Sequence, residues 1–152
     1  MRILLITVGR DRRGATAELV DTYLKRCPWK IEAIDIVPQT QGDKAKRLSA
    51  EADKIRQTLP AGTALIALDE RGKDLTSRDF AERIERFREE GHQALAFLIG
   101  GADGLDPLLI KAADLKLAFG RAVWPHRLVK VMLTEQLYRA STISSGHPYH
   151  RD

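Results

Sequence analysis

Reactive side chains are concentrated in the last six residues of the chain, HPYHRD. His147 and His150 can take up a proton near neutral pH, Tyr149 can stack on a nucleobase, and Arg151 can pair with a phosphate or a carbonyl oxygen. Chain ends are usually frayed, so this chemistry needs a surface that orders the tail. The alternative is that Pro148 and Tyr149 merely hold the tail on the surface and the histidines take no part in chemistry.

Two glycine-containing segments could hold a ligand against the backbone. LIGGADGL (98–105) contains a glycine pair and then Gly104, and glycine lets a ligand lie directly on main-chain amides. A tight turn explains that segment equally well. AFGRAVWPH (118–126) contains Gly120 and Trp124 and could cradle a flat ring. The alternative there is that Trp124 fills space in the core.

The first loop argues against a nucleotide triphosphatase. Gly9 and Gly14 have the glycine spacing of a P-loop, but Ala15 stands where that motif needs a lysine to neutralise phosphate charge. Further along, Lys44 and Arg47 belong to a basic cluster that suits phosphates, although helix solubility explains them as simply. We predict no metal site.

Short β-branched runs alternate with longer amphipathic segments, a pattern typical of βαβ units and a parallel sheet. The expected strands cover 2–8, 31–37, 64–68, 94–99 and 115–119. The expected helices cover about 15–26, 43–58, 77–90, 105–113 and 126–143. Together they predict an α/β fold, a three-layer α/β/α sandwich around a parallel sheet of about five strands. Ligands of such sheets bind beyond the carboxyl ends of the strands, which selects the loops after residues 8, 37, 68, 99 and 119.

Length and composition predict one cytoplasmic, soluble domain over residues 1–152. The single cysteine, Cys27, cannot form an internal disulfide, and no apolar run reaches the roughly 20 residues that a membrane span needs. The N-terminus does not read as a signal peptide, so we expect no membrane partner.

The net charge of +4 is unevenly distributed. Lys and Arg outnumber Asp and Glu by 12 to 8 in residues 1–60 and by 5 to 2 in 120–152, but are outnumbered 8 to 11 in 61–119. Basic ends that flank an acidic middle suit a polyanionic partner such as nucleic acid. Ordinary scatter over a solvated surface explains the same counts.

Three segments together resemble a known family. They are LDERGKDLTS (68–77), LIGGADGL (98–105) and the ending WPHRLVKVMLTEQLYRA…GHPYHRD. These segments are similar to the SPOUT-type ribosomal RNA large subunit methyltransferase H family, whose members methylate N3 of a pseudouridine in 23S rRNA. The likeness spans nearly the whole chain. It implies an enzyme that depends on S-adenosyl-L-methionine, a homodimer, and a C-terminal trefoil knot, which general folding rules would not predict.

The resemblance also implies site residues. By position, the cofactor-binding residues are Leu68, Gly101, Gly120, Arg121, Ala122, Val123, Trp124 and Pro125. The catalytic or RNA-orienting residues are His147, Tyr149, His150 and Arg151 of the tail. Weaker candidates for RNA contacts are Arg139, Lys44 and Arg47. The implied partner is 23S rRNA, in the large subunit or in the 70S ribosome.

The chemistry of the implied reaction gives the tail a role. An imide nitrogen must lose its proton before or during methyl transfer, so a base or an oxyanion stabiliser is needed beside the uracil ring. We expect the tail of one subunit to dock at the cofactor pocket of its partner, which would supply the order that a terminus lacks.

The last long helix carries an apolar stripe interrupted by charge. The stripe consists of Leu128, Val131, Met132, Glu135, Tyr138 and Arg139, with Glu135 and Arg139 spaced to pair at i, i+4. It suits a dimer interface, with core packing as the alternative.

A second, non-enzymatic function is consistent with many of these features. A non-catalytic RNA-binding or ribosome-assembly factor would use the same basic ends and the same aromatic tail. The presence of all three pocket loops together with the tail favours the enzyme.

Overall fold

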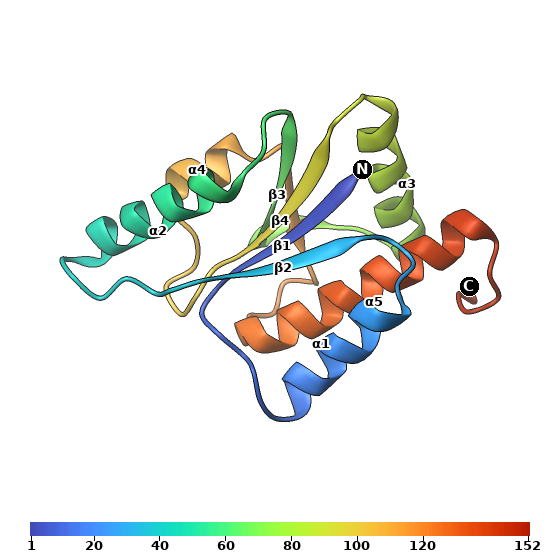
Figure 1. Ribbon diagram of the computed structural model, residues 1–152, viewed down its shortest axis with the longest axis horizontal. Helices are drawn as coiled ribbons and strands as arrows, with labels where there is room; N and C mark the ends of the chain where they lie inside the picture. Colours follow the sequence, from blue (N-terminus) through green and yellow to red (C-terminus); the bar gives the residue numbers. More distant parts are fainter.

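A five-stranded parallel sheet with helices on both faces forms the protein (Figure 1). The computed structural model describes residues 1–152. Its strands are β1 (Arg2–Val8), β2 (Ile31–Ile36), β3 (Thr63–Asp74), β4 (Ala94–Ile99) and β5 (Leu115–Ala118). Its helices are α1 (Ala15–Arg26), α2 (Lys44–Thr58), α3 (Ser77–Glu89), α4 (Pro107–Ala112) and α5 (His126–Ser145). The predicted order of elements and the α/β class are confirmed.

The strand order in the sheet is β2-β1-β4-β3-β5, and every neighbouring pair is parallel. The central strand β4 is buried at every residue, because helices cover both faces of the sheet there. The edge strand β2 is only partly covered, and Glu32 and Ala33 are exposed. The strands leave the sheet in the same direction, so the loops that follow them share one edge.

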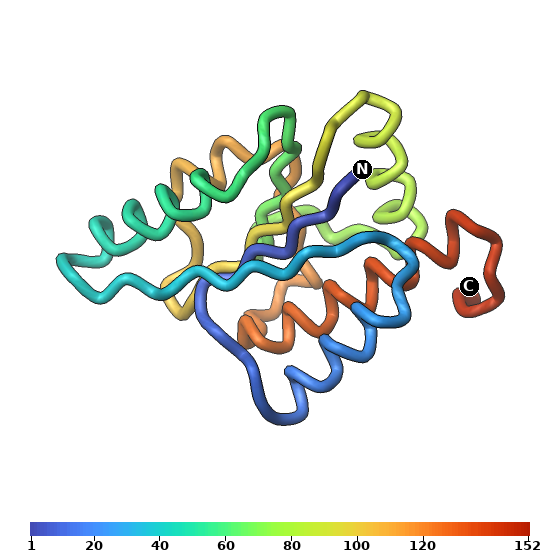
Figure 2. The backbone as a smooth tube through the Cα atoms, in the orientation of Figure 1, coloured from blue at the N-terminus to red at the C-terminus, as the bar shows by residue number.

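Each face of the sheet has its own apolar core. Ile3 and Leu5 of β1 pack in a cluster with α3 and α5, while Leu4 and Ile6 of the same strand pack with α2 and α4. This alternation follows from the period of two along a strand. The backbone trace separates the layers, with α1 beside α5 on one face and α2 and α4 on the other (Figure 2).

Strand β3 runs further than the sequence indicated, to Asp74 rather than to about residue 68. Its first part pairs with β4 on one side and, from Ile66 to Leu68, with β5 on the other. After a shift in register, Lys73 and Asp74 pair with β5 again. Gly72 makes this approach possible, since a Cβ there would lie 2.6 Å from the carbonyl carbon of Lys116. Leu68 and Lys73 both pair with Leu117, so residues 69–72 between them bulge out of the strand without pairing to β5.

Local signals set most helix boundaries. The side chains of Asp43 and Thr76 accept hydrogen bonds from the backbone N–H groups of Lys46 and Asp79, which caps α2 and α3. At its other end α5 stops at Gly146, which is left-handed with φ of 70°. None of the helices is both long and apolar enough to cross a membrane.

Candidate functional site

Three loops at the carboxyl edge of the sheet enclose a cavity of about 720 Å³. Their lining residues are 68–71 in β3, 99–105 at and after the end of β4, and 117–120 with 122–126 at and after the end of β5. The volume lies within the range of about 300–1,000 Å³ that is typical of small-molecule sites. These three are among the five strand-end loops that the sequence selected, and the structure brings them together.

Most of the residues implied as cofactor contacts line this cavity. They are Leu68, Gly101, Gly120, Ala122, Val123, Trp124 and Pro125. The exception is Arg121, which is exposed and does not line the cavity. Lys44, implied as an RNA contact, lies at the cavity wall, and Arg47 lies outside it, 3.5 Å from Asp103.

Trp124 does not fill space in the core, so that alternative is wrong. Its side chain is 44% exposed at the cavity wall. The indole N–H donates a hydrogen bond of 2.9 Å to the carbonyl oxygen of Phe119. This bond ties the two ends of the last pocket loop together, and it holds an aromatic face at the mouth of the cavity.

The glycine loop depends on Gly100, which sequence reasoning passed over in favour of Gly101. A Cβ at Gly100 would lie 2.4–2.8 Å from backbone atoms of Gly104, whereas one at Gly101 would make an ordinary contact of 3.5 Å with Val8. An antiparallel bridge joins Gly101 to Gly104 across this turn. The glycine pair in the sequence indicated that the backbone is crowded at this point. Only the structure shows that Gly100 is the crowded one of the two.

Polar groups at the cavity wall were also missed. His126 lies there as the first residue of α5, directly after Pro125. Asp69 lies in the β3 loop with its side chain only 7% exposed, and it accepts hydrogen bonds from the backbone and guanidinium of Arg71. These bonds lower the pKa of Asp69 below its usual value, so the carboxylate stays ionised beside the cavity.

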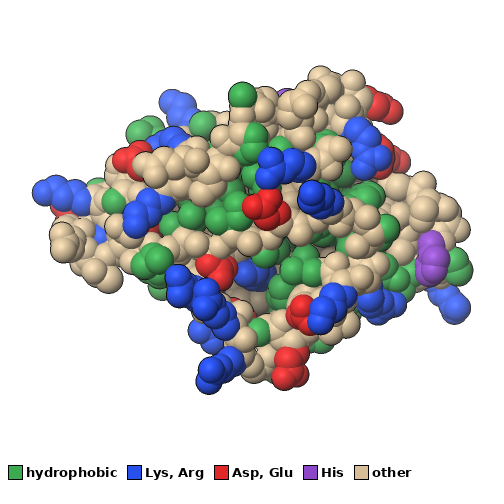
Figure 3. All heavy atoms as spheres, viewed as in Figure 1, with side chains coloured by type: hydrophobic (Ala, Val, Ile, Leu, Met, Phe, Trp, Pro, Cys, Tyr) green, Lys and Arg blue, Asp and Glu red, His purple; other side chains and the backbone are tan.

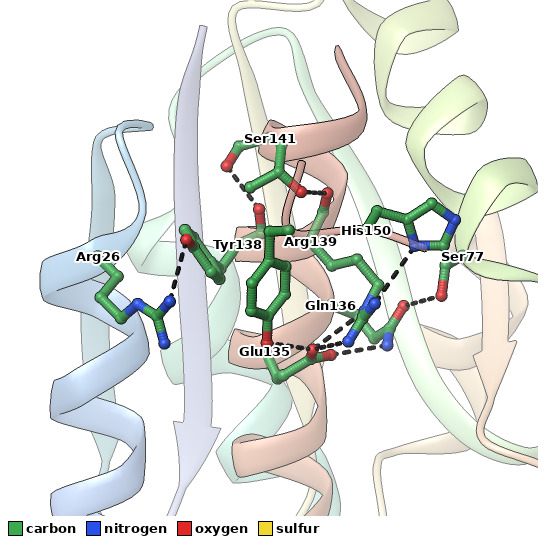
Figure 4. A network of polar contacts seen from close by, with 10 residues as sticks. Arg26, Ser77, Glu135, Gln136, Tyr138, Arg139, Ser141 and His150 are labelled. Atoms are coloured by element: carbon green, nitrogen blue, oxygen red, sulfur yellow. Dashed lines mark hydrogen bonds and ion pairs between the residues drawn. The ribbon is translucent and has the colours of Figure 1, made fainter. Parts of the chain in front are cut away.

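The C-terminal tail is ordered by side chains of its own chain (Figure 4). The hydroxyl of Tyr149 donates to Glu135 at 3.0 Å, and the same carboxylate forms an ion pair of 2.6 Å with Arg139. The ring of Tyr149 packs on Tyr138, with the centroids 4.6 Å apart, and the guanidinium of Arg26 lies over both rings. The predicted pairing of Glu135 with Arg139 is confirmed.

The last residue of the chain, Asp152, connects the tail to a third helix, α3. Asp152 forms a bidentate ion pair with Arg78, near the start of α3, and this arginine lowers the pKa of Asp152 to about 2. Burial and the hydrogen bond to Glu135 raise the pKa of Tyr149 to about 12. At neutral pH Tyr149 is therefore a neutral donor and Asp152 is a carboxylate.

The contacts of His150 define its tautomer. Its Nδ1 lies 3.3 Å from Nη1 of Arg139, and a guanidinium has no acceptor, so Nδ1 must accept the hydrogen bond. The proton of the neutral ring then lies on Nε2, which donates to Asp152 at 3.1 Å. His147 and Arg151 are exposed. While the tail is docked in this way, the lone pair of His150 is engaged by Arg139.

In one chain the tail and the cavity lie at different points along α5. The cavity reaches α5 at His126 and Val129, whereas Tyr149 docks at Glu135. Glu135 follows Val129 by six residues, which is roughly 9 Å along the helix at about 1.5 Å per residue. None of the tail residues lines the cavity of its own chain. A catalytic role for the tail therefore stays a prediction.

The stripe along α5 faces away from the sheet core. The α5 residues that pack against the sheet are Leu133, Leu137 and Ala140. Of the predicted stripe, Leu128 is 40% exposed and only Tyr138 is buried, where it packs against Tyr23 of α1. Packing in the sheet core does not account for the stripe, and an interface with another chain stays a prediction.

Comparison with known proteins identifies the family. Residues 1–150 match the family described as "Predicted SPOUT methyltransferase". The chain belongs to the SPOUT methyltransferase family. Curated relatives named ribosomal RNA large subunit methyltransferase H include those of Ruegeria pomeroyi (49% identical over 99% of both chains) and Paracoccus denitrificans (47% identical over the full length of both). A third, from Bradyrhizobium diazoefficiens, is 46% identical over 99% of both chains.

These matches confirm the resemblance seen in the sequence, and they cover the chain from end to end. A methyltransferase needs a site for its methyl donor, and the position of that site in this chain stays a prediction.

Proposed function

We propose that this SPOUT methyltransferase transfers a methyl group from S-adenosyl-L-methionine to N3 of a pseudouridine in 23S rRNA, on the large subunit or the assembled 70S ribosome. We place it in the cytoplasm as a homodimer, with the C-terminal trefoil knot that the resemblance implies. The observation that carries this proposal is the cavity of about 720 Å³, built by the three predicted loops in a chain of this family.

The residues at the cavity fit the proposed donor. S-adenosyl-L-methionine combines a flat adenine, a ribose and a charged amino-acid portion, and it supplies a methyl group bound to a positively charged sulfur. Trp124, Leu68 and Val129 offer apolar surface for a ring, and the glycines of the turn at 100–104 offer backbone groups without a side chain. Asp69 supplies a buried negative charge near a cationic ligand.

The protein contributes mainly by positioning. In-line methyl transfer needs two reacting centres held in alignment and shielded from water, and such alignment supplies roughly 7–11 kcal/mol. The indole hydrogen bond of Trp124 to Phe119 and the close packing at Gly100 keep two of the cavity loops rigid. Rigid walls suit this task better than mobile ones.

The acceptor base is oriented by the tail of the partner protomer in this proposal. The tail of one chain does not reach its own cavity, whereas a second copy packed on the α1 and α5 face would bring its own tail to this region. The exposed apolar side chains Leu19, Val123 and Leu128 mark that face. Tyr149 and Arg151 would then orient the uracil ring. A histidine of the tail would accept the N3 proton, and His150 could do so only after its ring is released from Arg139.

The test is methyl transfer from radiolabelled S-adenosyl-L-methionine to 70S ribosomes, large subunits and free 23S rRNA that lack this modification. Mass spectrometry of the digested rRNA would locate the methyl group. We expect N3-methylpseudouridine as the product and calorimetric binding of S-adenosyl-L-methionine at micromolar affinity. ATP serves as the control ligand and is expected not to bind.

Failure of these measurements has a defined meaning. A protein that binds neither ligand and methylates none of the three RNA substrates contradicts the proposal. If it still binds ribosomes, the non-catalytic RNA-binding or ribosome-assembly factor becomes the better account. Methylation at a different RNA position would contradict only the assignment of the substrate.

A further inference from the structure

The loop from Gly9 to Gly14, which joins β1 to α1, carries three arginines that have no partner in the protein. Arg10, Arg12 and Arg13 are all exposed, and none of them makes a side-chain hydrogen bond or an ion pair. Lys and Arg side chains gather over this loop on the molecular surface (Figure 3). Three guanidinium groups within four residues repel one another, so a partner that neutralises them is favoured.

The only acidic residue of the loop is turned inward. The side chain of Asp11 is 7% exposed and accepts a 2.5 Å hydrogen bond from the hydroxyl of Thr16. Its other carboxylate oxygen lies 3.9 Å from Arg127. Asp11 therefore fixes the base of the loop against α1 and α5, and it forms no ion pair with any of the three arginines.

The loop starts beside the cavity. Val8, the last residue of β1, lies where a Cβ on Gly101 would touch it at 3.5 Å, and Gly101 lines the cavity. On the other side, the contact of Asp11 with Arg127 ties the loop to the residue after His126, which also lines the cavity. The three arginines therefore belong to a loop that is held at two points next to the cavity wall.

We propose that Arg10, Arg12 and Arg13 bind the phosphate backbone of the rRNA strand whose base enters the cavity. This inference rests on the proposed function and extends it by assigning the surface that holds the RNA. Arginine pairs well with phosphate because its planar fork donates two parallel hydrogen bonds. A base that leaves its stack to enter a pocket draws its neighbouring phosphates over the rim, and this loop lies beside that rim.

The test compares two triple variants that remove the same charge. The loop variant carries Arg10→Gln, Arg12→Gln and Arg13→Gln. The matched control carries Lys30→Gln, Lys54→Gln and Arg86→Gln, three exposed cations without ion pairs that lie before β2, on α2 and on α3. Binding to 70S ribosomes is measured over a range of salt concentrations, and S-adenosyl-L-methionine affinity is measured by calorimetry.

We expect the loop variant to bind ribosomes about tenfold or more weakly, with the slope of log K against log salt reduced by about 2, because three contacts on a single strand release about 0.7 counterions each. Its S-adenosyl-L-methionine affinity and melting temperature should match the unmodified protein. The control variant should keep the ribosome affinity within about threefold, which separates a local contact from an effect of net charge.

The opposite results overturn the inference. Equal ribosome affinity and an equal salt slope for the loop variant would remove the loop from the interface. An equal loss in both variants would reduce the effect to net charge. If the unmodified protein binds no ribosomes at all, the proposed function fails together with this inference, whereas the first two results leave the proposed function intact.

Discussion

Two surfaces lie at opposite ends of α5, and they are built in different ways. At the amino end, the cavity is made by strand-end loops whose shape depends on main-chain contacts, such as the approach of Gly100 to Gly104. At the carboxyl end, the tail is held by side chains, with Glu135 and Arg78 as its main anchors. The cavity should therefore be sensitive to single added atoms, and the tail should be removable without unfolding the protein.

The largest effect should come from adding one methyl group to the glycine turn. Gly100→Ala places a Cβ within 2.8 Å of backbone atoms that cannot rotate away, so we expect a loss of about 1–3 kcal/mol in unfolding free energy. S-adenosyl-L-methionine binding should be lost with the shape of the loop. Urea denaturation and calorimetry measure the two effects.

Gly101→Ala is the matched control for the folding effect. Its Cβ meets Val8 at an ordinary distance of 3.5 Å, so its unfolding free energy should stay within about 0.5 kcal/mol of the unmodified protein. Equal stability of the two variants would mean that the glycine turn is not close-packed. The cavity at the amino end of α5 would then not depend on main-chain contacts.

Deletion of residues 147–152 should have a smaller effect on folding and a selective effect on activity. The deletion removes the tail but none of the residues that line the cavity. We expect methyl transfer to ribosomes to fall at least a hundredfold, while the S-adenosyl-L-methionine affinity changes less than about threefold. This activity loss corresponds to roughly 3 kcal/mol or more of transition-state stabilisation. Full activity of the truncated protein would leave the tail without a catalytic role.

The smallest effect concerns the pH range over which the tail stays docked. The pKa of Asp152 is lowered from 3.8 to about 2, so its ion pair with Arg78 is complete above the ordinary value and is lost as the pH falls through about 2. The pKa of Tyr149 is raised from 10 to about 12, so its contribution is complete below pH 10 and is lost as the pH rises through about 12.

This range can be followed by NMR. The nuclear Overhauser contacts between the rings of Tyr149 and Tyr138 should persist between these limits, and Asp152→Asn should weaken docking at neutral pH and remove the acid limb of the curve. If the unmodified protein and Asp152→Asn show the same acid limb, the contact with Arg78 does not hold the tail in solution.

Periodicity and capping residues were sufficient to predict the order of elements. The expected strand 2–8 matches β1, and the expected helix start at residue 77 follows from the cap at Thr76. The shorter helix was less well bounded. It covers Pro107–Ala112 instead of 105–113, because Asp106 caps it and because proline is favoured in the first turn.

The site was predictable where one rule of sheet geometry governs it. Carboxyl ends of parallel strands share an edge, so the loops that contain Leu68, Gly101 and Trp124 could be grouped before any contact was known. The position of Arg121 outside the cavity could not be predicted, because the direction of a side chain on an irregular loop depends on every neighbouring contact.

The sequence by itself determined the elements, their alternation and the edge of the sheet at which the cavity lies. These properties depend on local periodicity and on general rules of parallel sheets. Only the tertiary structure decided that β3 runs on past its bend to pair with β5, that Gly100 is the crowded glycine, and that Asp152 meets Arg78. The residues in that last contact are 74 positions apart. A contact of this kind depends on where two helices and a tail pack together, and no local pattern in the chain encodes that meeting point.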